Sequence, residues 1–154
     1  MEKVMEEIEE IGKKVKERED LAEKILKELM DVQDKLANKV KKIEGLNIAF
    51  ETEQGNIIRF SERTWRFGTG RVVYYYITVN DKFLTDKAEK LGNSTYWYGD
   101  FNNYAEFVTL EEAIDLANNI EKLITLVKQE IERQNSKSKD VLEKLSNCDL
   151  GSIF

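Results

Sequence analysis

Residues 46–60 read LNIAFETEQGNIIRF, and this stretch decides the fold class. Apolar and polar residues alternate in its first half, which is the period of a half-buried β-strand. Gln54, Gly55 and Asn56 then supply a tight-turn signal, and a second apolar run follows directly. The stretch therefore predicts an antiparallel β-hairpin.

More strands are expected after this hairpin. Residues 71–79, RVVYYYITV, are apolar or aromatic at both parities, which is typical of a central strand. A one- or two-turn helix is expected at 86–91. Shorter strand patterns occur at 82–84, 94–98 and 104–108. We therefore predict an antiparallel sheet of four to six strands over residues 46–108, with a small helical insertion.

The strand that follows the first turn carries a parity conflict. Ile58 and Phe60 share one face of an ideal strand, whereas Trp65 and Phe67 share the other face. A β-bulge or bend near residues 61–63 is required if all four side chains are to face the core.

Residues 1–45 have the apolar period of a long coiled-coil helix. Their apolar side chains recur at alternating spacings of four and three residues, interrupted by Arg18 and Lys39. Gly45 marks the expected end of the helix. Because such a helix is longer than a small domain, we expect part of it to project. The seam residues expected to mediate association are Ile8, Val15, Ile25, Leu29, Val32 and Leu36.

Residues 109–148 predict a second long helix. Thr109 and Glu112 have the spacing of a capping box, which marks its start. The apolar residues keep one helical phase, so a single helix is favoured, with a break near the polar residue Asn135 as the alternative. The seam residues of this helix are Ile120, Ile124, Val127 and Ile131.

These elements predict an α+β protein that forms a single domain over residues 1–154. It consists of a long helix, an antiparallel sheet region, a second long helix and an apolar tail at 149–154. We expect coiled-coil-like packing of the helices, either against each other as an antiparallel hairpin or against copies of themselves.

Composition excludes several classes of protein. The chain is 41% hydrophobic, has no proline and carries a net charge of −6, which indicates a soluble folded protein. Its apolar runs are too short to cross a bilayer, and its first residues, MEKVMEEIEE, lack the basic start of a signal peptide. The single cysteine, Cys148, forms no internal disulfide. We therefore expect a cytoplasmic protein that does not bind membranes.

The absence of histidine limits the chemistry that the chain could perform. Histidine is the commonest general base and the commonest zinc ligand, and the sequence contains none. We predict no catalytic residue, no cofactor and no metal site. An enzyme that works with other side chains is the third choice among the functions considered.

Arginine and aromatic residues gather in the sheet region. Four of the six arginines fall between residues 59 and 71, and aromatic residues alternate with them. Such a face can bind phosphates and bases, or the carboxylates of a protein. The structural alternative is that the arginines shield a sheet edge or pair with Glu51 and Glu53. The candidate binding residues are Arg59, Arg63, Trp65, Arg66, Phe67, Arg71, Tyr74 and Tyr76.

Two functions follow from these patterns. The favoured one is a non-catalytic scaffold or adaptor that self-associates through its helices and contacts another protein through the sheet face. Nucleic-acid binding through the arginines is the second, and the net charge of −6 disfavours it.

Overall fold

A computed structural model describes the chain apart from residues 68–69, 86–94, 98–103 and 149–154. For the strand residues 65–67, 70–72, 95–97 and 104–105 it describes the backbone alone. The chain divides into two units, Met1–Asn119 and Ile120–Phe154, each considered by itself. The helical insertion expected at 86–91 and the tail at 149–154 lie outside the described residues.

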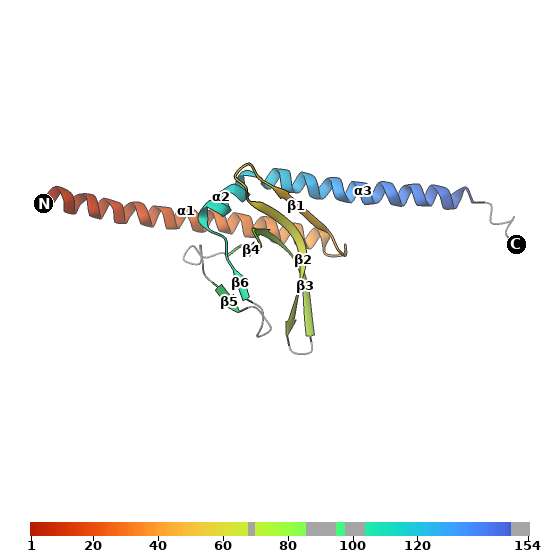
Figure 1. Cartoon of the computed structure of the whole chain (residues 1–154), viewed down its shortest axis with the longest axis horizontal. Helices are drawn as coiled ribbons and strands as arrows, with labels where there is room; N and C mark the ends of the chain where they lie inside the picture. Colours follow the sequence, from red (N-terminus) through yellow and green to blue (C-terminus); the bar gives the residue numbers. More distant parts are fainter. Residues whose placement is uncertain (68–69, 86–94, 98–103, 149–154) are drawn as a thin grey trace. The chain divides into compact units, whose positions relative to one another are not determined.

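The first unit combines two helices with antiparallel strands (Figure 1). Helix α1 spans Glu2–Val40, and helix α2 spans Leu110–Asn118. The main sheet has the order β1-β2-β3-β4, with β1 at Asn47–Glu51, β2 at Ile57–Phe67, β3 at Gly70–Val79 and β4 at Lys82–Phe83. A separate pair joins β5 (Thr95–Trp97) to β6 (Tyr104–Glu106). The α+β class with an antiparallel sheet is therefore confirmed.

The register of the long hairpin β2–β3 is uninterrupted. Ile58 pairs with Val79, and every residue of β2 from there to Phe67 has a partner on β3. The expected bulge near 61–63 is therefore absent, and β2 keeps strict alternation. Phe60 and its partner Ile77 are fully buried and belong to the core face.

One face of α1 is buried in this unit. Its buried residues recur every three or four positions, as on one side of an α-helix, and α1 contacts both β3 and α2. Gln33 is the polar member of this face, and its Oε1 accepts a hydrogen bond of 2.9 Å from the backbone N–H of Ile77. The buried residues are Ala22, Leu26, Leu29, Gln33, Ala37 and Val40.

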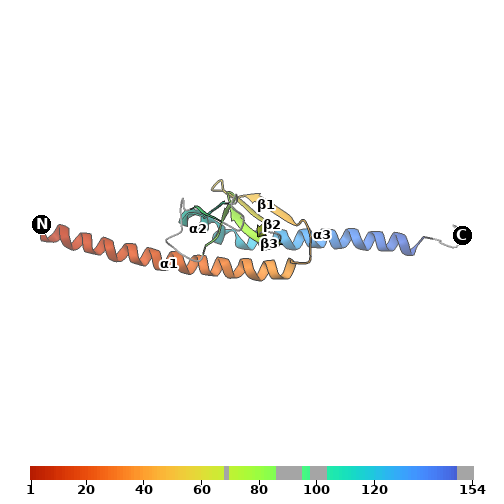
Figure 2. The same cartoon turned by 90° about the horizontal axis from the view of Figure 1, so that it is seen from below.

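The first half of α1 has no cover within the described residues. Residues 1–20 are all exposed, and Figures 1 and 2 show this part of the helix running beyond the sheet. Val4, Ile8, Ile11 and Val15 are 54%, 53%, 59% and 48% exposed. Their spacing puts them in phase with Ala22 and the buried face, so the apolar stripe continues along α1 with an interruption at Arg18, and β3 and α2 cover only its second half.

Helix α1 ends earlier than expected. It stops at Val40 rather than near residue 45, and Gly45 lies in the following loop with a φ of 74°. The buried hydroxyl of Tyr75 fastens this loop, because it donates to the carbonyl of Ile43 at 2.5 Å and accepts from the N–H of Leu46 at 3.2 Å.

The C-terminal helix is divided, which corrects the expectation of one continuous helix over 109–148. Helix α2 ends at Asn118, and helix α3 spans Ile120–Ser146. The amide of Asn119 donates to the backbone carbonyl and the carboxylate of Asp115, at 2.8 and 3.1 Å, and so competes with continuation of the helix.

Helix α3 passes through residues 135–138 without a break. Ser138 keeps its hydroxyl within the helix by donating to the carbonyl of Gln134 at 2.9 Å. Within the described residues, no helix combines the length and the apolar composition that crossing a membrane requires.

Replacement of Gln33 tests the buried contact between α1 and β3. Gln33→Met keeps the volume of the side chain but leaves the buried N–H of Ile77 without its acceptor, so we expect a loss of about 1–3 kcal/mol in the free energy of unfolding. Leu29→Met, on the same buried face, is the control and should cost less than about 1.5 kcal/mol. Urea titration followed by circular dichroism measures both, and equal losses would contradict the assignment.

Candidate functional site

The structure places four of the predicted binding residues on one face of the sheet. Arg63 lies directly opposite Tyr74 in the β2–β3 register, and Arg59 and Tyr76 have the same parity as this pair. This face is opposite to the one that carries Phe60 and Ile77. These four residues therefore share one face of the sheet, and its role as a binding face stays a prediction.

Both arginines already have partners in the fold. Arg59 donates to the side-chain oxygen of Asn47 on β1 at 2.9 Å. Arg63 lies 3.6 Å from the carboxylate of Asp81, and its guanidinium carbon stands 5.9 Å from the centre of the Phe83 ring. The expected partners Glu51 and Glu53 are thus replaced by Asn47 and Asp81.

One hydrogen-bond donor of Arg63 nevertheless lacks a partner among the described residues. Its Nε atom is buried and has no hydrogen-bond partner among the described residues, although the side chain as a whole is 39% exposed. Arg59, Arg63 and Asp81 line a shallow cavity of about 430 Å³, together with Glu62 and residues 45–47. Because the lining carries both signs of charge, it does not form a purely cationic anion-binding surface.

The tyrosines of this face form an aromatic ladder. The rings of Tyr74 and Tyr76 meet edge to face at 5.3 Å, and Tyr76 meets Phe83 in the same way at 5.3 Å. The hydroxyl of Tyr74 donates to Asp34 on α1 at 3.3 Å. Burial, and then the charge of Asp34 and this hydrogen bond, raise the pKa of Tyr74. The Tyr74 side chain therefore stays a neutral phenol that donates to Asp34.

The side chains of the other four predicted residues lie outside the described ones. Their backbones belong to the far end of the β2–β3 hairpin, where the register pairs Arg66 with Arg71 and Trp65 with Val72. Phe67 pairs with Gly70 at the end of the ladder.

The predicted seam residues divide between exposed and covered positions. Ile8 and Val15 are exposed, and Leu29 is buried against the first unit. Ile25, Val32 and Leu36 are half-buried beside the buried face. In the second unit Val127 is buried, and the half-buried seam residues are Ile120, Ile124 and Ile131.

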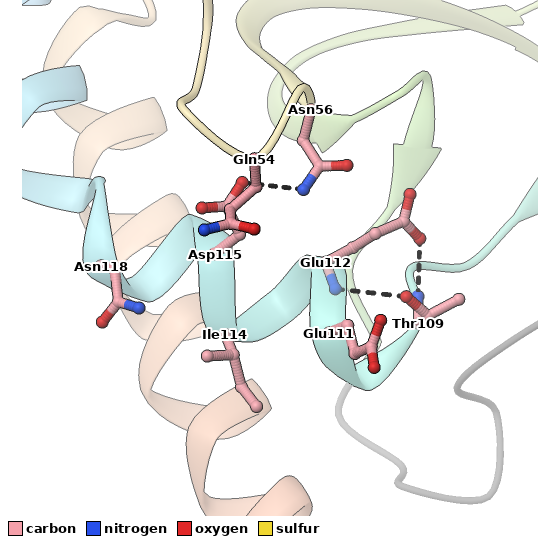
Figure 3. Close-up of a pocket in the computed structure, with 8 residues that line it drawn as sticks. All are labelled: Gln54, Asn56, Thr109, Glu111, Glu112, Ile114, Asp115 and Asn118. Carbon is pink, nitrogen blue, oxygen red and sulfur yellow. Dashed lines mark hydrogen bonds between the residues drawn. The ribbon is translucent and has the colours of Figure 1, made fainter.

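A second cluster, which the sequence analysis missed except for the capping box, lies at the start of α2. Thr109 and Glu112 form the expected capping box (Figure 3). One turn later the buried carboxylate of Asp115 accepts from the Thr52 hydroxyl at 2.5 Å and from the Asn56 amide at 2.7 Å. A cavity of about 490 Å³ opens beside these side chains.

Glu112 is the charged centre of this cluster. Its carboxylate accepts from the Thr109 N–H at 2.8 Å, from the amide of Asn80 at 2.8 Å and from the ammonium of Lys82 at 3.2 Å. Burial alone would raise the pKa of Glu112, but these hydrogen bonds and the charge of Lys82 outweigh it and lower the pKa. Side chains and backbone N–H groups of this chain already donate to the carboxylates of Glu112 and Asp115. The cluster therefore joins α2 to the turn before Asn56 and to the turn that contains Asn80.

Neither metal chemistry nor a known relative assigns a role to these residues. No group of three or more acidic or cysteine side chains in the described part of the chain could hold a metal ion. No family model, curated protein or solved structure matches this chain.

Substitution of Glu112 tests the cluster through its pH dependence. Folding lowers the pKa of Glu112, so the ionised carboxylate stabilises the folded state. This stabilisation is fully present above the ordinary glutamate pKa of about 4.3, and it is lost as the pH falls through the lower pKa that Glu112 has in the folded chain. We expect Glu112→Gln to lower the free energy of unfolding by about 1–2 kcal/mol at pH 7, and by progressively less below a pH of about 4.

The measurement is urea unfolding of the wild type and the variant between neutral and acidic pH. Glu111→Gln, an exposed neighbour in the same turn, is the control and should follow the wild-type profile. If Glu112→Gln ran parallel to the wild type at every pH, the linkage assigned to Glu112 would be wrong.

Proposed function

We propose that this chain is a non-catalytic protein-interaction or scaffolding protein of the cytoplasm. It associates with copies of itself through its helices and offers the arginine- and tyrosine-bearing sheet face to another protein. The observation that carries the proposal is the exposed apolar stripe on the first half of α1, formed by Val4, Ile8, Ile11 and Val15.

The stripe supports association because of its form. A helix in a protein draws most of its stability from packing of its apolar face, and large side chains at four-three spacing are the seam of a coiled coil. Isolated apolar residues on a surface need no explanation, but a continuous row marks a contact surface. Packing against a partner helix would remove this row from water.

The sheet face supports a protein partner rather than a nucleic acid. Arg59 and Arg63 are held by Asn47 and Asp81, and acidic residues stand among the cavity residues around them. A polyanion would have to displace these contacts and approach a chain of net charge −6. A protein surface with its own carboxylates and amides can share the guanidinium groups.

Sedimentation of a stripe variant tests self-association. Ile8→Gln with Ile11→Gln removes two apolar seam residues while helix propensity is kept, so we expect dimers or larger assemblies of the wild type at tens of micromolar to dissociate. Glu9→Gln with Lys13→Gln introduces the same residue type on the opposite side of α1 without a change of net charge, and should leave association intact. A monomeric wild type would contradict the proposal.

Salt dependence of nucleic-acid binding tests the alternative. Four arginine contacts to duplex DNA would give a slope of log affinity against log salt near ~−3.6, reduced by about 0.9 for each arginine removed. We expect weak or absent binding to labelled duplex and single strands, and no change with Arg59→Ala and Arg63→Ala. Tight binding with a slope that flattens in these variants would support a nucleic-acid interface instead.

A further inference from the structure

The charges along the exposed half of α1 are segregated, and this determines how two copies could pair. Residues 2–10 contain five glutamates and one lysine, so this stretch carries a net charge of −4. Residues 13–18 contain four basic side chains and one glutamate, a net charge of +3. All of these residues are exposed in the structure.

Parallel pairing would bring like charges together. The acidic stretch of one copy would run beside the acidic stretch of the other, and Arg18, a seam position, would face its own counterpart. Antiparallel pairing about the midpoint between Glu9 and Glu10 places residues 2–6 of each copy, with a net charge of −1, beside residues 13–17 of the other copy, with a net charge of +2. Like charges at short range are unfavourable, so the charge pattern selects the antiparallel arrangement.

The apolar stripe has a matching symmetry. When the two helices run in opposite directions about the midpoint between Glu9 and Glu10, Val4 of one copy faces Val15 of the other, and Ile8 faces Ile11. Each of the four seam residues then has an apolar partner, as the alternating layers of an antiparallel coiled coil require. Arg18 lies at the edge of this overlap, where its side chain reaches solvent.

The positions flanking the seam agree with this register. Glu7 and Lys14 flank the stripe on one side, where antiparallel helices bring such residues of the two copies together, so the register forms two symmetry-related Glu7–Lys14 contacts. On the other side Met5 meets Gly12 of the second copy, and a Cβ added at Gly12 would have nothing within 4 Å in the free chain. Gly12 leaves room for the methionine side chain.

The buried part of α1 fixes how far the second copy can extend. Ala22 is already 1% exposed, so a partner helix cannot continue along the stripe past this point. There the groove between α1 and α2, of about 300 Å³, is lined by Arg18, Leu21, Ile25, Leu110 and Ile114 among others. In the antiparallel register Met1 of the second copy lies opposite Arg18, at the mouth of this groove.

We infer that two copies of this chain pair antiparallel through residues 1–18 of α1, with Val4 facing Val15, Ile8 facing Ile11 and Glu7 facing Lys14. This inference rests on the proposed self-association and specifies its geometry. The occupant of the stripe is therefore a second copy in one orientation and one register.

Charge reversal tests the geometry in the full chain. Glu7→Lys and Lys14→Glu each replace two attractive contacts by two repulsive ones, so each should weaken the dimer about tenfold, or about 1.4 kcal/mol. The double variant should return to within about threefold of the wild type. Lys14→Glu also breaks the Lys14–Glu10 contact of 3.9 Å within α1, but residue 7 is two turns away and cannot repair that loss.

Cysteine pairing supplies a second measurement, which does not depend on charge. In a Cys148→Ser background, Ile8→Cys mixed with Ile11→Cys should form disulfide-linked heterodimers in a glutathione redox buffer, whereas either variant alone should not. Circular dichroism should show the wild-type helical content in each variant.

The outcomes separate the inference from the proposed function. A wild type that sediments as a monomer overturns both. A dimer that the double charge reversal does not restore, or that forms Ile8→Cys homodimers, overturns the antiparallel register while self-association stands.

Discussion

The first unit depends on one contact: the apolar face of α1 packed against the sheet and α2. Leu26 and Ala37 lie in the part of the stripe that is buried, and Gln33 connects the helix to the backbone of β3 through the N–H of Ile77. A buried glutamine on an apolar face costs free energy unless its acceptor is used, so this hydrogen bond fixes the position of the helix along the strand. The rest of the unit is arranged around it.

Polar contacts then reinforce the attachment of α2, whose Ala113 and Leu116 are also buried in the apolar core. Asp115 connects α2 to the turn that contains Asn56, and Glu112 connects it to Asn80 and Lys82 at the next turn. Both carboxylates are charged groups surrounded by donors, which makes each contact directional in a way that apolar packing is not. The start of α2 is thereby held against two loops that are far apart in sequence.

Local signals in the sequence predict most of the helices and strands, but they do not predict the contacts between residues that are far apart in the sequence. The hairpin around Gly55, the central strand β3 and the capping box at Thr109 were all predicted, because alternation, turn residues and caps act over a few positions. The break at Asn119 was missed since the apolar phase continues across it, and only a side-chain bond to Asp115 reveals it. The partners of Arg59 and Arg63 were also missed, because a partner such as Asp81 is brought close by the fold rather than by spacing.

The exposed half of α1 would also set the distance between the two sheets of a pair. In the antiparallel pair that we propose, the two sheets would stand at opposite ends of the shared helical segment, and the two Ala22 positions where the covered parts begin would lie about 37 Å apart along the axis. A short rod of two helices resists bending over that distance. Two identical contact faces would therefore be presented at a set separation, so that a ligand carrying two copies of the matching surface at the same interval would be held far more tightly than a ligand with one.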